Sequence, residues 1–123
     1  MKITAFNPAI LTRQYDDVIK LFEELGFSKR HRNDVTNAQI ESNIRMKDEN
    51  GFYIDINNAD FVPQDATLIR MNVDNFDEGF KILTEHGFTN ALGEGNFIET
   101  PFLKGAHMTS KTGMSIMLMH HKK

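Results

Sequence analysis

Hydrophobic and polar residues follow two different spacings along this chain, one typical of helices and one typical of strands. Residues 15–28 and again residues 76–89 place apolar side chains at the i, i+3, i+4 and i+7 positions that form one face of a helix. The residues that we assign to these faces are Val18, Leu21, Phe22 and Leu25 in the first segment and Phe76, Phe80 and Leu83 in the second. Two amphipathic helices are therefore predicted.

The two helical segments also repeat one another. They are identical at five of fourteen aligned positions, and each ends in a Gly-Phe pair. We expect Gly26 and Gly87 to end the helices in a left-handed conformation. Asn75, with a glutamate three residues later, resembles a capping box, whereas Thr12 or Gln14 is a weaker cap for the first helix. The sequence therefore indicates an internal duplication.

The segments around the helices alternate between apolar and polar residues, as strands do. Strands are predicted at residues 3–11, 28–32, 40–47 and 52–57 in the first copy and at residues 67–73, 89–92, 102–108 and 114–120 in the second. The Asn50-Gly51 pair is a strong hairpin signal. We therefore predict an α+β fold of tandem βαβββ repeats in one domain, 1–123, with repeats at 1–57 and 67–123 and a linker at 58–66.

A twice-repeated βαβββ unit in a chain of this length resembles the vicinal oxygen chelate superfamily, which includes glyoxalase I, bleomycin-resistance proteins and ring-cleaving dioxygenases. The segments that carry the resemblance are residues 22–27, 51–56 and 73–77. The resemblance implies a curved mixed sheet around a cleft that holds a metal ion, a ligand or both. It also implies a homodimer.

Metal-dependent members of that superfamily place ligands on the first and last strand of each repeat. By this resemblance, the four positions fall on Asn7, Asp55, Leu68 and Met117. Leu68 has no donor atom, and the Met117 thioether is a poor ligand for a hard divalent ion. We therefore expect neither a metal site nor a cofactor.

Strand alternation also sorts residues into a face toward the helix and a face toward the cleft. Phe6, Phe52, Ile54 and Ile56 are expected to pack on the helix side. The predicted ligand-binding residues on the cleft side are Asn7, Arg45, Tyr53, Asp55, Arg70, Asn72, His107 and Met117, with Ser115 and Met119 nearby. The two arginines could bind a carboxylate or phosphate, or instead pair with Asp55 or Glu41.

Composition narrows the function classes. The chain has 14 Lys and Arg against 17 Asp and Glu, no cysteine, and no apolar run long enough to span a bilayer. A nucleic-acid or membrane partner, a thiolate site and a secretory leader are therefore not expected, and we predict a cytoplasmic protein. His120 and His121 are interpreted as part of a solvated tail.

These observations favour a metal-independent protein that binds a small molecule in the cleft. Two alternatives stay open at this point. One is a lyase or isomerase with an atypical or absent metal site, in which Asp55 and His107 could transfer a proton, although no catalytic residue is assigned. The other is an interaction module whose cleft is filled by side chains.

Overall fold

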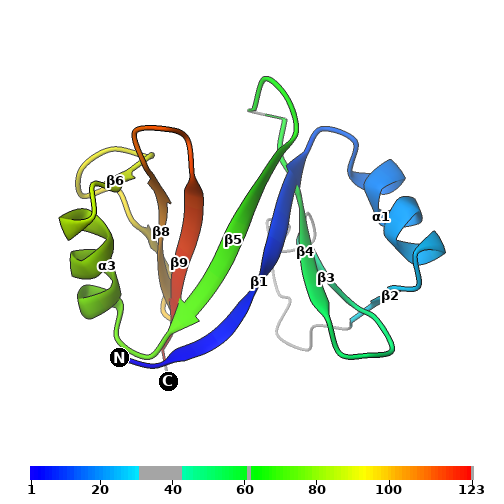
Figure 1. The fold of residues 1–123 in the computed structure, drawn as a ribbon, viewed down its shortest axis with the longest axis horizontal. Helices are drawn as coiled ribbons and strands as arrows, with labels where there is room; N and C mark the ends of the chain where they lie inside the picture. Colours follow the sequence, from blue (N-terminus) through cyan, green and yellow to red (C-terminus); the bar gives the residue numbers. More distant parts are fainter. Residues whose placement is uncertain (31–42, 61, 123) are drawn as a thin grey trace. The chain divides into compact units, whose positions relative to one another are not determined.

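The computed structural model of the chain describes residues 1–30, 43–60 and 62–122. Within these ranges it contains nine strands and two helices, and the contacts divide the chain into two compact units. We call Asn7–Thr67 the first unit and Met1–Phe6 with Leu68–Lys123 the second unit. Each unit has a helix that follows a long strand and precedes shorter ones, so the predicted α+β fold of repeated βαβββ elements is confirmed (Figure 1).

In the first unit, helix α1 (Tyr15–Glu24) packs against a mixed sheet. The strands of this sheet are β1 (Ile3–Thr12), of which residues 7–12 belong to this unit, β2 (Ser28–Lys29), β3 (Asn43–Lys47) and β4 (Tyr53–Asn58). Strand β3 is antiparallel to both β2 and β4, whereas β1 is parallel to β4. A mixed sheet with one parallel neighbour needs a crossover, which α1 provides between β1 and the later strands.

The core of the first unit lies between α1 and one face of this sheet. Ile19, Met46 and Ile56 are buried there, and Phe22 packs against them. Leu21 and Leu25, which the sequence assigned to the buried helix face, are instead 50% and 61% exposed. The predicted face was therefore right for Val18 and Phe22, which pack on this core, and wrong for Leu21 and Leu25.

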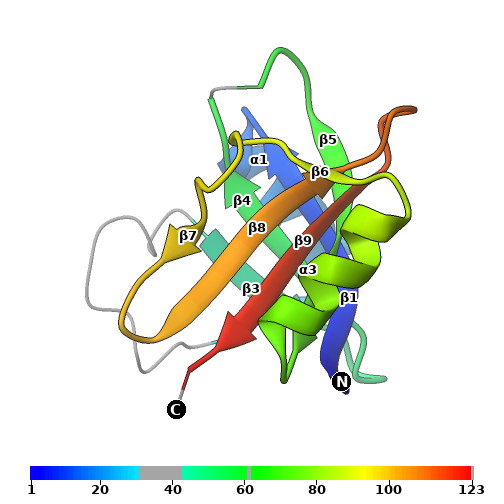
Figure 2. The ribbon, with the colours of Figure 1, turned by 90° about the vertical axis from the view of Figure 1, so that its left-hand side faces the viewer.

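The second unit is built in the same way around helix α3 (Phe76–Glu85). Its strands are β5 (Ala66–Val73), β6 (Thr89–Asn90), β7 (Ile98–Glu99), β8 (Leu103–Thr109) and β9 (Ser115–His121). Strand β9 is parallel to β5 and antiparallel to β8, while β6 and β7 pair with different parts of β8. Figure 2 shows α3 beside β8 and β9, the strands that it contacts.

The core of the second unit confirms the predicted face of its helix. Phe76 and Leu83 are buried against Ala106 and Leu118, and Phe80 packs on the same cluster. The ring of Phe97 meets both Phe76 and Phe80 edge-to-face, with centroids 5.5 and 5.4 Å apart. These rings therefore fix the segment before β7 to the helix, an attachment that alternation along strands does not predict.

Most strand predictions agree with the structure to within one or two residues. The exceptions are the short strand β7, which the sequence did not predict, and the parts of two predicted strands that fall on residues 31–32 and 40–42, outside the described residues. Neither described helix is long and apolar enough to cross a membrane.

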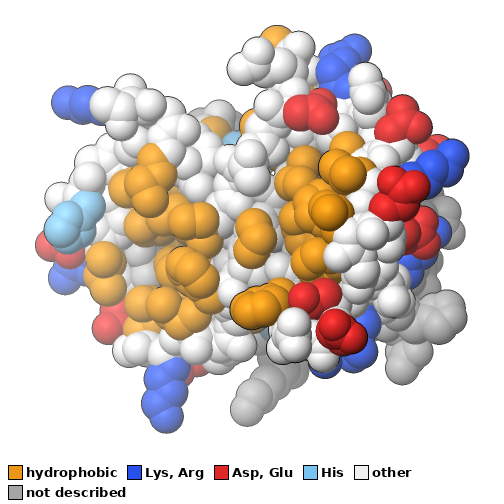
Figure 3. All heavy atoms as spheres, turned by 45° about the vertical axis from the view of Figure 1, so that its right-hand side comes forward, with side chains coloured by type: hydrophobic (Ala, Val, Ile, Leu, Met, Phe, Trp, Pro, Cys, Tyr) orange, Lys and Arg blue, Asp and Glu red, His pale blue; other side chains and the backbone are white. Residues whose placement is uncertain are grey.

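Several large hydrophobic side chains stay at the surface. Phe6 and Phe52, which were expected on the helix side of their strands, are 62% and 66% exposed, so that assignment was wrong for both. Phe52 precedes β4, and alternation holds only inside a strand. Figure 3 shows one face of the molecule, on which hydrophobic side chains (orange) gather in patches.

The two helices start differently. The Asn75 side chain accepts a hydrogen bond from the backbone N–H of Glu78 at 3.1 Å, which confirms the predicted cap. Gln14 holds the equivalent position before α1 but makes no capping hydrogen bond through its side chain. Gly26 and Gly87 follow the helices with φ of 103° and 90°, as predicted for left-handed helix ends.

We predict that Asn75→Ala destabilises the protein by about 1 kcal/mol, because the N–H of Glu78 loses its acceptor. Urea denaturation measures this loss. Gln14→Ala is the matched control, and its effect is expected to be within about 0.5 kcal/mol of zero. Equal losses in the two variants would contradict the assigned cap.

Candidate functional site

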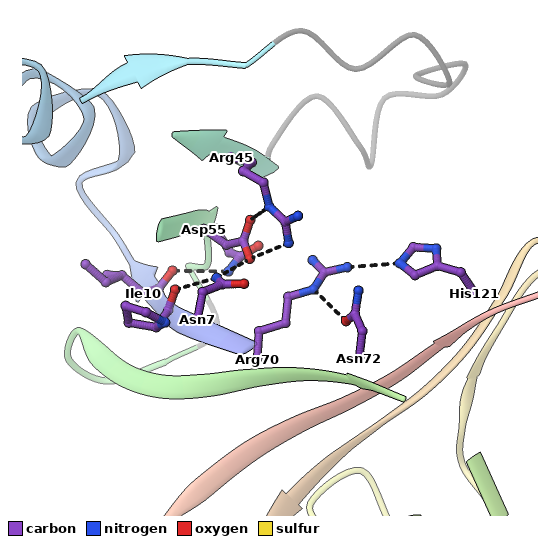
Figure 4. A network of polar contacts seen from close by, with 9 residues as sticks. Asn7, Ile10, Arg45, Asp55, Arg70, Asn72 and His121 are labelled. Carbon is purple, nitrogen blue, oxygen red and sulfur yellow. Dashed lines mark hydrogen bonds and ion pairs between the residues drawn. The ribbon is translucent and has the colours of Figure 1, made fainter. Parts of the chain in front are cut away.

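In the first unit, the sheet face opposite α1 carries a polar cluster. Arg45 on β3 and Asp55 on β4 lie directly opposite each other in the strand register. The guanidinium donates from Nε to Asp55 Oδ1 at 2.9 Å and from Nη2 to Oδ2 at 3.2 Å. Asn7 on β1 donates from Nδ2 to Asp55 Oδ2 at 2.7 Å (Figure 4). Two of the predicted site residues therefore converge on the carboxylate of a third.

This carboxylate is held deep in the sheet. The side chain of Asp55 is 2% exposed and that of Arg45 is 24% exposed. A buried carboxylate is stable only when a charge partner and hydrogen-bond donors replace its water, and Arg45 and Asn7 supply both. Of the partners that the sequence allowed for Arg45, the structure contains Asp55, whereas Glu41 lies outside the described residues.

Tyr53, another predicted site residue, lies on the same face. The Arg45 guanidinium is 5.2 Å from the centre of its ring, and the Lys47 ammonium is 5.3 Å away. Lys47 is opposite Tyr53 in the register of β3 and β4, so strand pairing sets this contact. The ring therefore supports the orientation of Arg45 through a cation–π contact.

In the second unit, Arg70 and Asn72 project from the same face of β5. Arg70 donates from Nε to Asn72 Oδ1 at 3.2 Å, and its Nη2 lies 3.4 Å from Nε2 of His121 (Figure 4). Because a guanidinium only donates, the His121 nitrogen is the acceptor. The structure therefore brings together Arg70 and Asn72, which are predicted site residues, and His121, which the sequence analysis placed in a solvated tail.

His107 and Met117 also belong to this face, because their neighbours Ala106, Met108, Ile116 and Leu118 pack toward α3. The two residues are directly opposite each other on β8 and β9. The Nε2 atom of His107 is shielded from solvent, and it has no hydrogen-bond partner among the described residues. Burial lowers the pKa of His107 from its usual value of 6.5, which favours the neutral imidazole.

Met119 completes the apolar part of this face. It is 7% exposed, and its thioether lies over Gly105, where a Cβ atom would overlap with the sulfur. The glycine on β8 therefore provides the space that the Met119 side chain fills. Because methionine is flexible and polarisable, its thioether can adapt to an apolar neighbour.

The interpretation of His120 and His121 as a solvated tail was wrong. Both belong to β9, and alternation sends them to opposite faces. His120 Nδ1 lies 2.9 Å from the carbonyl oxygen of Val73, so Nδ1 carries the proton. His121 contacts Arg70 instead. The closing strand therefore extends by one residue beyond its predicted end, and both histidines have structural contacts.

Comparison with solved structures identifies the fold. The chain is similar to a glyoxalase/bleomycin resistance protein/dioxygenase superfamily member from Vibrio splendidus, at a TM-score of 0.64 and 9% identity, over 97% of this chain and 99% of the other. It is also similar to a glyoxalase I mutant from Zea mays, at a TM-score of 0.68 and 13% identity, over 97% of this chain and 43% of the other. A Staphylococcus aureus protein matches at a TM-score of 0.67 and 11% identity, over 99% and 100% of the two chains.

The chain has the glyoxalase/bleomycin resistance/dioxygenase fold. The resemblance found in the sequence, to the vicinal oxygen chelate superfamily, is thereby confirmed at the level of fold. No protein-family model matches the sequence, and no curated protein sequence matches it either. The glyoxalase/bleomycin resistance/dioxygenase fold is compatible with several chemistries, so function must come from the side chains of this chain.

The four positions that the resemblance assigns to metal ligands do not fit a divalent metal ion. In the first unit, both oxygens of Asp55 accept hydrogen bonds from Arg45, and Asn7 turns its amide N–H group, a donor, toward the same carboxylate. In the second unit, Leu68 has no donor atom and Met117 offers only a thioether. Across the described parts of the chain, no three His, Asp or Glu side chains are grouped closely enough to hold a metal ion.

The predicted site residues thus form two groups, one in each unit. The first contains Asn7, Arg45, Tyr53 and Asp55, and the second contains Arg70, Asn72, His107 and Met117. Their role in ligand binding stays a prediction. The sequence analysis missed His121, although the alternation that selected Met117 and Met119 also selects residue 121.

We predict that Arg45→Met destabilises the protein by about 2–3 kcal/mol, because the buried Asp55 carboxylate loses its guanidinium partner. Urea denaturation measures this loss, with Lys47→Met as the control on the same strand. Adding Asp55→Asn to Arg45→Met should recover part of the loss, since the remaining amide carries no charge. Purely additive losses in that double variant would contradict the ion pair.

We also predict that His107 makes stability fall on acidification. Because its folded pKa is lowered, the unfolded chain takes up the proton first as the pH falls below about 6.5. The contribution is complete above that pH and is lost progressively as the pH falls through the lowered folded pKa. Wild type should therefore lose stability relative to His107→Gln between pH 7.5 and pH 5. A difference that is constant over this range would show that His107 titrates normally.

Proposed function

We propose that the protein binds a small organic molecule without a metal ion, as a binding protein of the glyoxalase/bleomycin-resistance type. The observation that carries this proposal is the state of Asp55. It is the one carboxylate at the four metal-ligand positions of the superfamily, and Arg45 and Asn7 bind it instead. A guanidinium beside the carboxylate neutralises the charge that would attract a metal cation.

The sheet face of the second unit supports the small-molecule part of the proposal. It combines the thioethers of Met117 and Met119 with the polar groups of Arg70, Asn72 and His107. Surfaces on which a few polar groups stand among apolar ones are typical of small-ligand sites. The proposal also includes a cytoplasmic homodimer with no nucleic-acid or membrane partner.

The alternative of proton transfer by Asp55 and His107 has less support. A general base must have a free lone pair for the proton that it takes. Both oxygens of Asp55 already accept hydrogen bonds from Arg45, and Oδ2 also accepts one from Asn7, so the carboxylate is directed at these donors. We therefore favour binding over catalysis.

A thermal-shift screen of chelator-treated protein tests the proposal, using divalent metals and a panel of small organic molecules. A ligand present at 100 times its dissociation constant should add about 2.7 kcal/mol of stability. We expect stabilisation by at least one organic compound and none that requires Ni²⁺, Zn²⁺, Mn²⁺ or Co²⁺.

The variants Arg70→Ala and Lys81→Ala provide a matched pair for any compound found in this screen. Arg70 lies on the proposed binding face, whereas Lys81 is an exposed residue of α3. Binding should weaken in the first variant alone. Stabilisation by a metal without any organic compound would overturn the proposal, and a screen without any stabilising compound would favour the interaction module.

A further inference from the structure

The two units carry equivalent rows of three residues across their sheets. In the first unit, Asp55 on β4 lies between Ala9 on β1 and Arg45 on β3. In the second unit, Met117 on β9 lies between Arg70 on β5 and His107 on β8. In both rows, the central strand is parallel to one of its neighbours and antiparallel to the other. Met117 is therefore the counterpart of Asp55, and His107 is the counterpart of Arg45.

The two rows differ in how their polar atoms are satisfied. Arg45 and Asp55 form two hydrogen bonds with each other, at 2.9 and 3.2 Å. In the second row, a thioether faces the imidazole across the strands, and sulfur is only a weak acceptor. Nε2 of His107 is shielded from solvent and lacks a hydrogen-bond partner within residues 1–30, 43–60 and 62–122. A buried polar atom without a hydrogen-bond partner reduces stability, unless another molecule supplies the hydrogen bond.

The groups around Nε2 of His107 determine which kind of molecule could form a hydrogen bond with it. Met117 is its cross-strand neighbour, and Met119 fills the space over Gly105 on the same strand as His107. Thioethers cannot replace the hydration of a charge, so a charged group would lose solvation here without compensation. Arg70, on the far side of Met117 in the same row, already contacts Asn72 and His121. A hydroxyl group can either donate or accept, so it would suit both tautomers of the imidazole.

We propose that His107 is the specificity-determining residue of the second unit, and that it selects uncharged, mainly apolar molecules that carry one hydrogen-bonding group. This inference rests on the proposed function, since it names the ligand class for that same face. The first row is satisfied by its own residues and serves stability. The second row leaves one hydrogen bond to be made by the ligand.

Three matched probes test this inference, because they share one apolar ring and differ in a single group. Benzyl alcohol carries a hydroxyl, toluene carries no polar group, and benzoate carries a charge. Binding is followed by NMR through the methyl signals of Met117 and Met119, which Met117→Leu and Met119→Leu assign. We expect benzyl alcohol to bind about fivefold more tightly than toluene, the ratio given by one hydrogen bond of about 1 kcal/mol. Benzoate should bind more weakly than benzyl alcohol.

His107→Phe should abolish the preference for benzyl alcohol while keeping toluene binding, and His107→Gln should keep part of the preference. His86→Phe is the control, because His86 is an exposed residue at the end of α3. Thermal melting of each variant establishes that it is folded before the titrations.

The outcomes separate this inference from the proposed function. Equal binding of benzyl alcohol and toluene, a preference that survives in His107→Phe, or tighter binding of benzoate would overturn the role of His107 and leave small-molecule binding intact. If none of the probes moves the methionine signals, and the compound screen is also negative, the proposed function fails and this inference fails with it.

Discussion

The alternation of side chains along each strand is the constraint on which both units depend. One face of each sheet packs on a helix, through Met46 and Ile56 in the first unit and Ala106 and Leu118 in the second. A slip of one residue in any of these strands would turn its apolar set away from the helix. The burial of these residues therefore also fixes the opposite face, and it places Arg45 across from Asp55 and His107 across from Met117.

Much of this arrangement can be predicted from the sequence. Helix spacing and strand alternation are local patterns, and the repeat shows each of them twice. The cap at Asn75 and both glycine helix ends are local features. In α1 the predicted face was right for Val18 and Phe22, but it included Leu21 and Leu25 in place of Tyr15 and Ile19, and the core residues 15, 18, 19 and 22 follow the same helical spacing. These four positions are the counterparts of residues 76, 79, 80 and 83 in α3. The residues predicted for the second helix, Phe76, Phe80 and Leu83, correspond through the repeat to Tyr15, Ile19 and Phe22.

The site is less predictable than the fold. Alternation selects the residues that share a face, but it does not determine which of them form bonds. The sequence allows Arg45 to pair with more than one carboxylate, and the pairing with Asp55 depends on the register of β3 and β4. Whether Nε2 of His107 has a partner among the described residues depends on all its spatial neighbours together, and no local sequence pattern predicts this. His121 was missed because the strand was ended one residue too early.

The two equivalent rows of residues make different interactions, so each can have a different role. The Arg45–Asp55 pair stabilises its own sheet through side chains that belong entirely to the first unit. His107, Met117 and Met119 belong to the second unit, and the hydrogen bonds between Arg45 and Asp55 do not involve them. The ion pair of the first row and the imidazole–thioether pair of the second row are therefore carried by different residues of the repeat. Duplication thus gives one chain two equivalent positions with different chemistry, a carboxylate bound by a guanidinium in one unit and a thioether beside an imidazole in the other.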